Sequence, residues 1–92
     1  MPHAAKSFVE PERLFAMLNG RSVAASGHRW LIEVFSISHH SGHRWVQLAL
    51  SGPTQHFLTL RLTAGDGADR LVPALLSWLT HPSGSGQILN VA

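Results

Sequence analysis

Three histidines within five residues, His39, His40 and His43, form the densest group of chemically active side chains in the sequence. Imidazole nitrogens bind zinc, copper and nickel, so these histidines are candidate metal ligands. Further ligands are scarce, because the chain has no Cys and only five Asp and Glu residues. Neither a helical His-Glu-x-x-His motif nor a zinc-finger spacing occurs. We therefore expect solvent-exposed turn histidines and no cofactor.

Covalent and acid–base catalysis also have little support in the sequence. Ser26 and Ser85 each neighbour glycine, but neither stands in the Gly-x-Ser-x-Gly pattern of a nucleophile between a strand and a helix. Four of the five acids lie at predicted helix starts, where capping explains them. Glu33 is thus left without a second carboxylate. The sequence favours a protein that is not an enzyme, with a metal-dependent or hydrolytic enzyme as the least favoured alternative.

Length and composition indicate one small folded domain. The chain has 92 residues, of which 45% are hydrophobic and 13% charged. The sequence pI of about 10.6 is high because the chain has no Cys and no Tyr to titrate between histidine and the strong bases. The net charge is only +2 and the basic residues are scattered, so the chain is not polybasic. No apolar run approaches the roughly 20 residues of a membrane span, and residues 1–7 lack the apolar stretch of a secretory signal. We expect a cytoplasmic protein with no membrane contact.

Two helices and three strands are predicted from local patterns. The first helix lies within residues 7–20, since Ser7 and Glu10 have capping-box spacing and Gly20 can end it. The last helix begins among residues 65–69 and ends at His81. Between the helices, a connector of small residues precedes three runs with strand-like alternation. These runs cover residues 28–39, 43–50 and 55–63.

The sequence therefore predicts an α+β fold in the order helix-strand-strand-strand-helix, with a three-stranded antiparallel sheet and both helices on one face. This single domain spans residues 7–82. Residues 83–92 are predicted to form a flexible C-terminal tail because the segment opens with alternating Ser and Gly. The apolar residues near its end leave an added edge strand as the alternative.

This element order resembles that of the double-stranded RNA-binding domain, over the stretch from Ser7 to His81. The resemblance is one of topology, and it implies contact with RNA phosphates through a lysine-rich start to the second helix. The corresponding stretch here is Asp66-Gly67-Ala68-Asp69-Arg70, whose two carboxylates repel phosphate. The chain is not assigned to that family.

The turn between the first two predicted strands sets their register. We predict a three-residue loop, residues 40–42, with Gly42 in the left-handed conformation, so that His39 pairs with His43. In this register Val34 lies beside Leu48. On the face turned away from the apolar core, Glu33 forms a row with Ala49 and Phe57, Phe35 lies beside Gln47, and Trp45 lies between Ile37 and Arg61.

The sheet face turned away from the core is more apolar than a solvated face usually is. We expect something to cover it: a helix or the tail, a second copy of the chain, a protein partner or a ligand. The predicted contact residues on this face are Leu31, Phe35, Ile37, Trp45, Phe57 and Arg61.

The favoured function is a small non-enzymatic interaction module that forms a homodimer, or binds a protein partner, through this apolar face. The alternative is a nucleic-acid-binding module in which Trp45, Phe57 and Phe35 are stacking platforms near arginines. Glu33 on the same face and the small net charge argue against that alternative.

Overall fold

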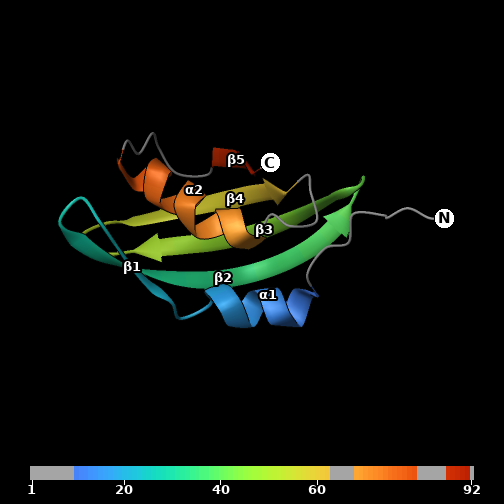
Figure 1. Cartoon of the computed structure of the whole chain (residues 1–92), viewed down its shortest axis with the longest axis horizontal. Helices are drawn as coiled ribbons and strands as arrows, with labels where there is room; N and C mark the ends of the chain where they lie inside the picture. The colour runs from blue at the N-terminus through green and yellow to red at the C-terminus, as the bar shows by residue number, and fades with distance from the viewer. Residues whose placement is uncertain (1–9, 63–67, 81–86, 92) are drawn as a thin grey trace.

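Helix α2 lies in the curve of a five-stranded sheet (Figure 1). The computed structural model describes residues 10–62, 68–80 and 87–91. In chain order the elements are α1 (Pro11–Leu18), β1 (Ser22–Ala25), β2 (His28–His40), β3 (His43–Ser51), β4 (Gln55–Leu62), α2 (Ala68–Thr80) and β5 (Gln87–Val91).

The sheet is mixed, with the strand order β1-β2-β3-β4-β5. Successive strands from β1 to β4 are antiparallel, whereas β5 runs parallel to β4. Parallel neighbours need a crossover connection, and α2 provides it. The three predicted strands are confirmed as β2, β3 and β4. The predicted three-stranded antiparallel sheet is nevertheless wrong, because one further strand flanks it on each side.

The two additional strands come from segments with weak strand signals. β1 lies in the predicted connector and pairs with the start of β2 across a tight turn, in which Ser26 and Gly27 both have positive φ. β5 lies in the predicted C-terminal tail, where residues 87–91 form the edge strand that the sequence leaves as the alternative. Each strand buries a valine, Val23 in β1 and Val91 in β5, and this burial holds it against the domain.

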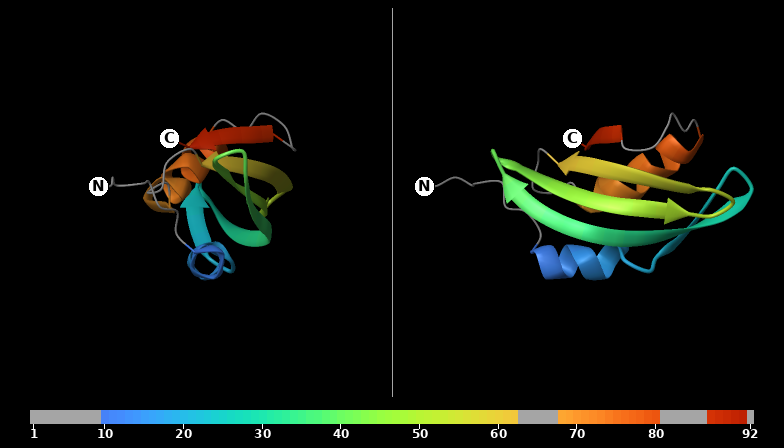
Figure 2. Two further views of the ribbon diagram at one scale, coloured as in Figure 1. Left: turned by 90° about the vertical axis from the view of Figure 1, so that its right-hand side faces the viewer. Right: turned by 180° about the vertical axis from the view of Figure 1, so that it is seen from behind.

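The core fills the space between the concave side of the sheet and α2. Leu48 and Leu60 from the central strands and Leu75 from α2 are fully buried in it. Helix α2 contacts both edge strands, β1 and β5, because the sheet curls around it (Figure 2). Helix α1 lies along β2 and buries Leu14 and Leu18. The prediction that α1 shares a sheet face with α2 stays a prediction.

Helix α1 is shorter than the sequence indicates. It begins at Pro11, and Glu10 before it makes no side-chain capping hydrogen bond. The other predicted capping residue, Ser7, lies outside the described residues. The predicted stop is confirmed, because the helix ends at Leu18 and Gly20 has a φ of 80°.

The turn between β2 and β3 has two residues, so the predicted three-residue loop is wrong. Ser41 and Gly42 have φ angles of 55° and 74°, and His40 pairs with His43. Two-residue turns with positive φ at both positions match the twist of the flanking strands, which is why hairpins favour them.

The shorter turn forces a bulge into β2. Val34 pairs with Leu48 as predicted, but Phe35 has no partner on β3. The register is then shifted by one residue, and Ile37 pairs with Val46. Ile37 therefore packs against the core, and its predicted place on the opposite face is wrong.

We expect Ser41→Asn to stabilise the fold by about 0.5–1 kcal/mol, because Asn adopts positive φ more readily than Ser and Asn-Gly is the favoured pair in this turn. Urea unfolding measures the change. The control is Ser38→Asn on the extended part of β2, which should bring no gain. A destabilised Ser41→Asn variant would contradict the assigned turn.

Candidate interaction surface

The convex side of the sheet, opposite α2, keeps large apolar side chains exposed. We call this side the outer face. Phe35 is 60% exposed, Ile88 56%, Phe57 45% and Leu31 41%. Three of these four residues are among the predicted contact residues. Ile88 is not among the predicted contact residues because it lies in the predicted tail. The available signal was the group of apolar residues Ile88, Leu89 and Val91 in that tail.

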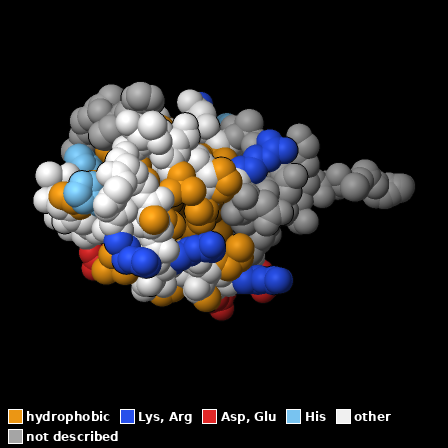
Figure 3. Space-filling model, turned by 60° about the vertical axis from the view of Figure 1, so that its left-hand side comes forward, with side chains coloured by type: hydrophobic (Ala, Val, Ile, Leu, Met, Phe, Trp, Pro, Cys, Tyr) orange, Lys and Arg blue, Asp and Glu red, His pale blue; other side chains and the backbone are white. Residues whose placement is uncertain are grey.

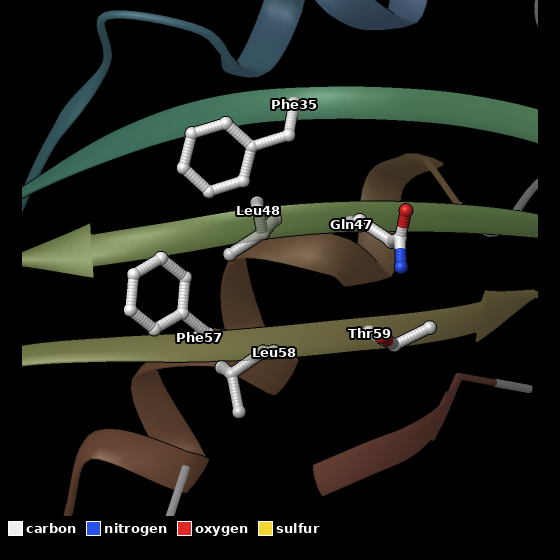
Figure 4. A pocket seen from close by; sticks show the side chains of 6 residues that line it. All are labelled: Phe35, Gln47, Leu48, Phe57, Leu58 and Thr59. Atoms are coloured by element: carbon white, nitrogen blue, oxygen red, sulfur yellow. The ribbon is translucent and has the colours of Figure 1, made fainter. Parts of the chain in front are cut away.

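The most exposed of these side chains, Phe35, stacks on Phe57. Phe35 comes from β2 and Phe57 from β4, and the two rings meet over β3 (Figure 4). Their centroids are 5.9 Å apart and their planes are inclined by 26°. Ala49, which pairs directly with Phe57, is fully buried although it belongs to the outer face. The rings thus cover β3 themselves but leave their own outer surfaces to solvent.

A depression of about 390 Å³ adjoins the two rings. Gln47 on β3 and Thr59 on β4 lie further along the strands beside it (Figure 4). A second depression, of about 370 Å³, lies between α1 and the bulge, where Phe15 and Ile37 line it. Phe35 borders both depressions, so it projects between two hollows of the surface.

Trp45 lies at one end of the outer face, and neighbouring side chains cover it. Its ring stacks on that of His40, with centroids 5.1 Å apart and planes inclined by 10°. The guanidinium carbon of Arg61, its partner in the sheet register, is 5.8 Å from the ring centroid. The buried Nε of Arg61 has no hydrogen-bond partner among the described residues. A cation over an indole ring is favourable, so these contacts hold Trp45 in place.

Glu33 is the acid that the described strands place on the outer face, toward its other end. The Glu33 carboxylate accepts a hydrogen bond of 3.3 Å from the Ser51 hydroxyl. Glu33 pairs with Ala49 in the predicted row. The outer face therefore carries Glu33 toward one end and Arg61 at the other. Arg29, which donates to the Ser22 hydroxyl at 3.5 Å, lies on the same side of β2 as Glu33.

The three candidate metal ligands lie on both sides of β2 and β3. His40 and His43 contact Trp45 on the outer face. His39 pairs with Arg44, a buried residue of the opposite side. Within the described part of the chain, no three His, Asp or Glu side chains gather into a group that could hold a metal ion.

Basic side chains are spread over the surface that Figure 3 shows, which brings forward the end of the molecule with the β1–β2 turn. They border a hydrophobic centre at several separate points rather than gathering into one patch. Proteins that bind nucleic acid usually cluster such residues on one face.

No family model matches the chain, and no curated protein or solved structure is similar to it. Among residues 10–62, 68–80 and 87–91, no helix has the length and apolar character needed to cross a membrane.

We expect no structural metal, because His39 lies on the other side of the strand from His40 and His43. Extensive chelation with EDTA should leave the thermal unfolding midpoint unchanged. Metal analysis before and after chelation accompanies the measurement. Stoichiometric zinc that survives chelation, or a large fall in the midpoint on its removal, would contradict this expectation.

Proposed function

We propose that the chain is a small non-enzymatic interaction module that binds a second copy of itself through the outer face. The observation that carries this proposal is the stacked pair of Phe35 and Phe57, which remains largely exposed beside a depression. Apolar patches of this kind on a small domain are often contact sites. A second phenylalanine pair is a chemically matched occupant for the hollows on either side of Phe35.

The available apolar area makes the expected association weak. Fully burying a Leu, Ile or Phe side chain contributes about 1.5–3 kcal/mol. The four exposed side chains of the outer face have about half of that burial still to gain, which amounts to about 3–6 kcal/mol per copy. Association costs about 4–15 kcal/mol. The monomer and the dimer should therefore exchange, and the dimer should form at high protein concentration.

The charges of the outer face favour an arrangement in which Glu33 of each copy faces Arg61 of the other, with the strands of the two copies crossing. Glu33 on β2 and Arg61 on β4 lie diagonally on either side of Gln47 on β3. A two-fold axis that passes over Gln47 within the interface exchanges these two positions. Each Glu33 then faces the partner's Arg61, so no carboxylate is buried without a counter-charge.

Binding of nucleic-acid bases to the same aromatic residues is less well supported. His40 and Arg61 already lie against Trp45, so a base that stacked there would have to displace them. Glu33 would also repel phosphates. The self-association experiments below include an oligonucleotide so that this outcome is measured directly.

Replacing Phe35 and Phe57 together by Ser should abolish self-association, because it removes the stacked rings. Sedimentation velocity at several concentrations, with and without a single-stranded oligonucleotide, measures the change. Circular dichroism reports whether the variant is folded, and Phe35→Ser alone is the milder variant. The matched control is Met17→Ser, which removes a 37% exposed side chain of α1 outside the outer face. A wild-type chain that stays monomeric at high concentration, or associates only on nucleic acid, contradicts the proposal.

Reversing one charge should weaken the dimer, and reversing both should restore it. Glu33→Arg places like charges opposite each other across the two-fold axis, so we expect a higher dissociation constant. Adding Arg61→Glu to the same chain recreates the complementary pair with opposite signs. If the doubly reversed chain dimerises no better than Glu33→Arg, the arrangement that pairs Glu33 with the partner's Arg61 is wrong.

A further inference from the structure

Near one edge of the sheet, β2 is paired beyond the length of β1. On the β1 side, the segment after α1 extends the pairing along β2. The Gly20 N–H donates to the Ile32 carbonyl at 2.8 Å, and the Ile32 N–H donates to the Arg21 carbonyl at 2.9 Å. Further along, the Val34 N–H donates to the Asn19 side-chain oxygen at 2.9 Å. β2 is thus paired within the chain as far as Val34, beyond the residues that pair with β1.

The opposite edge of the sheet is formed by β5. β5 pairs with β4 on one side, and no backbone hydrogen bond from a described residue reaches its other side. Exposed edges usually carry a charged residue, a proline or a bulge that prevents pairing with another strand. β5 reads Gln-Ile-Leu-Asn-Val and contains neither a charge nor a proline. Its edge is therefore competent to accept another strand.

We propose that β5 pairs antiparallel with β5 of a second copy, about a two-fold axis at Leu89. Two identical strands related by such an axis in one sheet can only be antiparallel, and the contact is closed and symmetric. Leu89 then faces the partner's Leu89, and Ile88 faces the partner's Asn90. The two sheets join into one continuous sheet.

A second copy fits this edge for reasons visible in its side chains. Leu89 packs against the core but remains only half-buried, so a second leucine across the axis completes its burial. Ile88 is 56% exposed at the rim of the outer face, and the partner's Asn90 would lie beside it. No charged residue occurs in the strand, so the pairing brings no like charges together.

This contact is independent of the proposed outer-face dimer. Phe35 lies on β2, three strands away from β5. Across a β5–β5 pairing, the two copies of Phe35 are separated by seven strand spacings, about 33 Å along the sheet. In the outer-face dimer, by contrast, the two copies of Phe35 lie near each other at the centre of the interface.

Disulfide trapping distinguishes the two contacts, because the chain has no Cys and every thiol in a variant is therefore an introduced reporter. Residues directly opposite in an antiparallel pair have Cα atoms about 4.5–5.5 Å apart, within the roughly 4.4–6.8 Å that a disulfide spans. Leu89→Cys and Phe35→Cys are each oxidised with glutathione disulfide in the full chain. Non-reducing electrophoresis then gives the cross-linked fraction. The double variant Ile88→Cys with Asn90→Cys changes two exposed positions and replaces Leu89→Cys if that chain does not fold.

We expect more than half of the Leu89→Cys molecules to form a cross-linked dimer that reducing agent separates. Cross-linking at Leu89→Cys without cross-linking at Phe35→Cys supports the β5 contact and contradicts the proposed outer-face dimer. The reverse result supports the outer-face dimer and overturns the β5 contact. A folded Leu89→Cys chain that stays monomeric under oxidation overturns the β5 contact whatever Phe35→Cys does.

Discussion

The exposed phenylalanine pair exists because β2 contains one residue more than β3 can pair. The two-residue turn at Ser41 and Gly42 fixes one end of the hairpin, and the buried pairs around Val34 fix the other. These two registers differ by one residue, and Phe35 absorbs the difference. A bulge leaves its extra residue outside the ladder and bends the strand. Phe35 consequently stands on the outer face, where its ring meets Phe57 across β3.

The same bulge supplies the core with Ile37. If the same sequence formed a regular strand without the bulge, Ile37 would lie on the outer face and Ser36 would point inward. With it, Ser36 donates a hydrogen bond of 2.6 Å to Gln47 on the outer face, and Ile37 packs against the core near Val46. Polar and apolar side chains therefore each reach a suitable environment. The cost is one phenylalanine left in solvent, which self-association can remove.

The sheet itself was largely predictable where alternation was long. The strands β2, β3 and β4, the row of Glu33, Ala49 and Phe57, and the pairing of Trp45 with Arg61 follow from alternating apolar residues. Alternation does not distinguish a two-residue from a three-residue turn, because Ser-Gly is compatible with both. The register that follows from a three-residue turn therefore pairs Phe35 with Gln47, whereas in the structure Gln47 pairs with Ser36.

The edge strands were not predictable from local pattern. β1 consists of Ser, Val and two Ala, which carry no period-two signal, and its pairing depends on contact with α2. β5 follows a Gly- and Ser-rich segment and pairs with β4, to which it is connected only through α2. Such long-range pairing is set by burial of Val91 rather than by propensity. The exposed Ile88 of the outer face was missed for this reason.

The central claim is that Phe35 and Phe57 of one copy contact the same residues of another. Isotope-filtered nuclear Overhauser spectroscopy on an equal mixture of ¹³C-labelled and unlabelled chain measures this contact directly. The account predicts cross-peaks between the labelled Phe35 and Phe57 ring protons and unlabelled chains, which increase with protein concentration. The claim is contradicted if the ring protons give only intramolecular cross-peaks in a sample that contains dimer. It is also contradicted if the chain remains monomeric at every concentration.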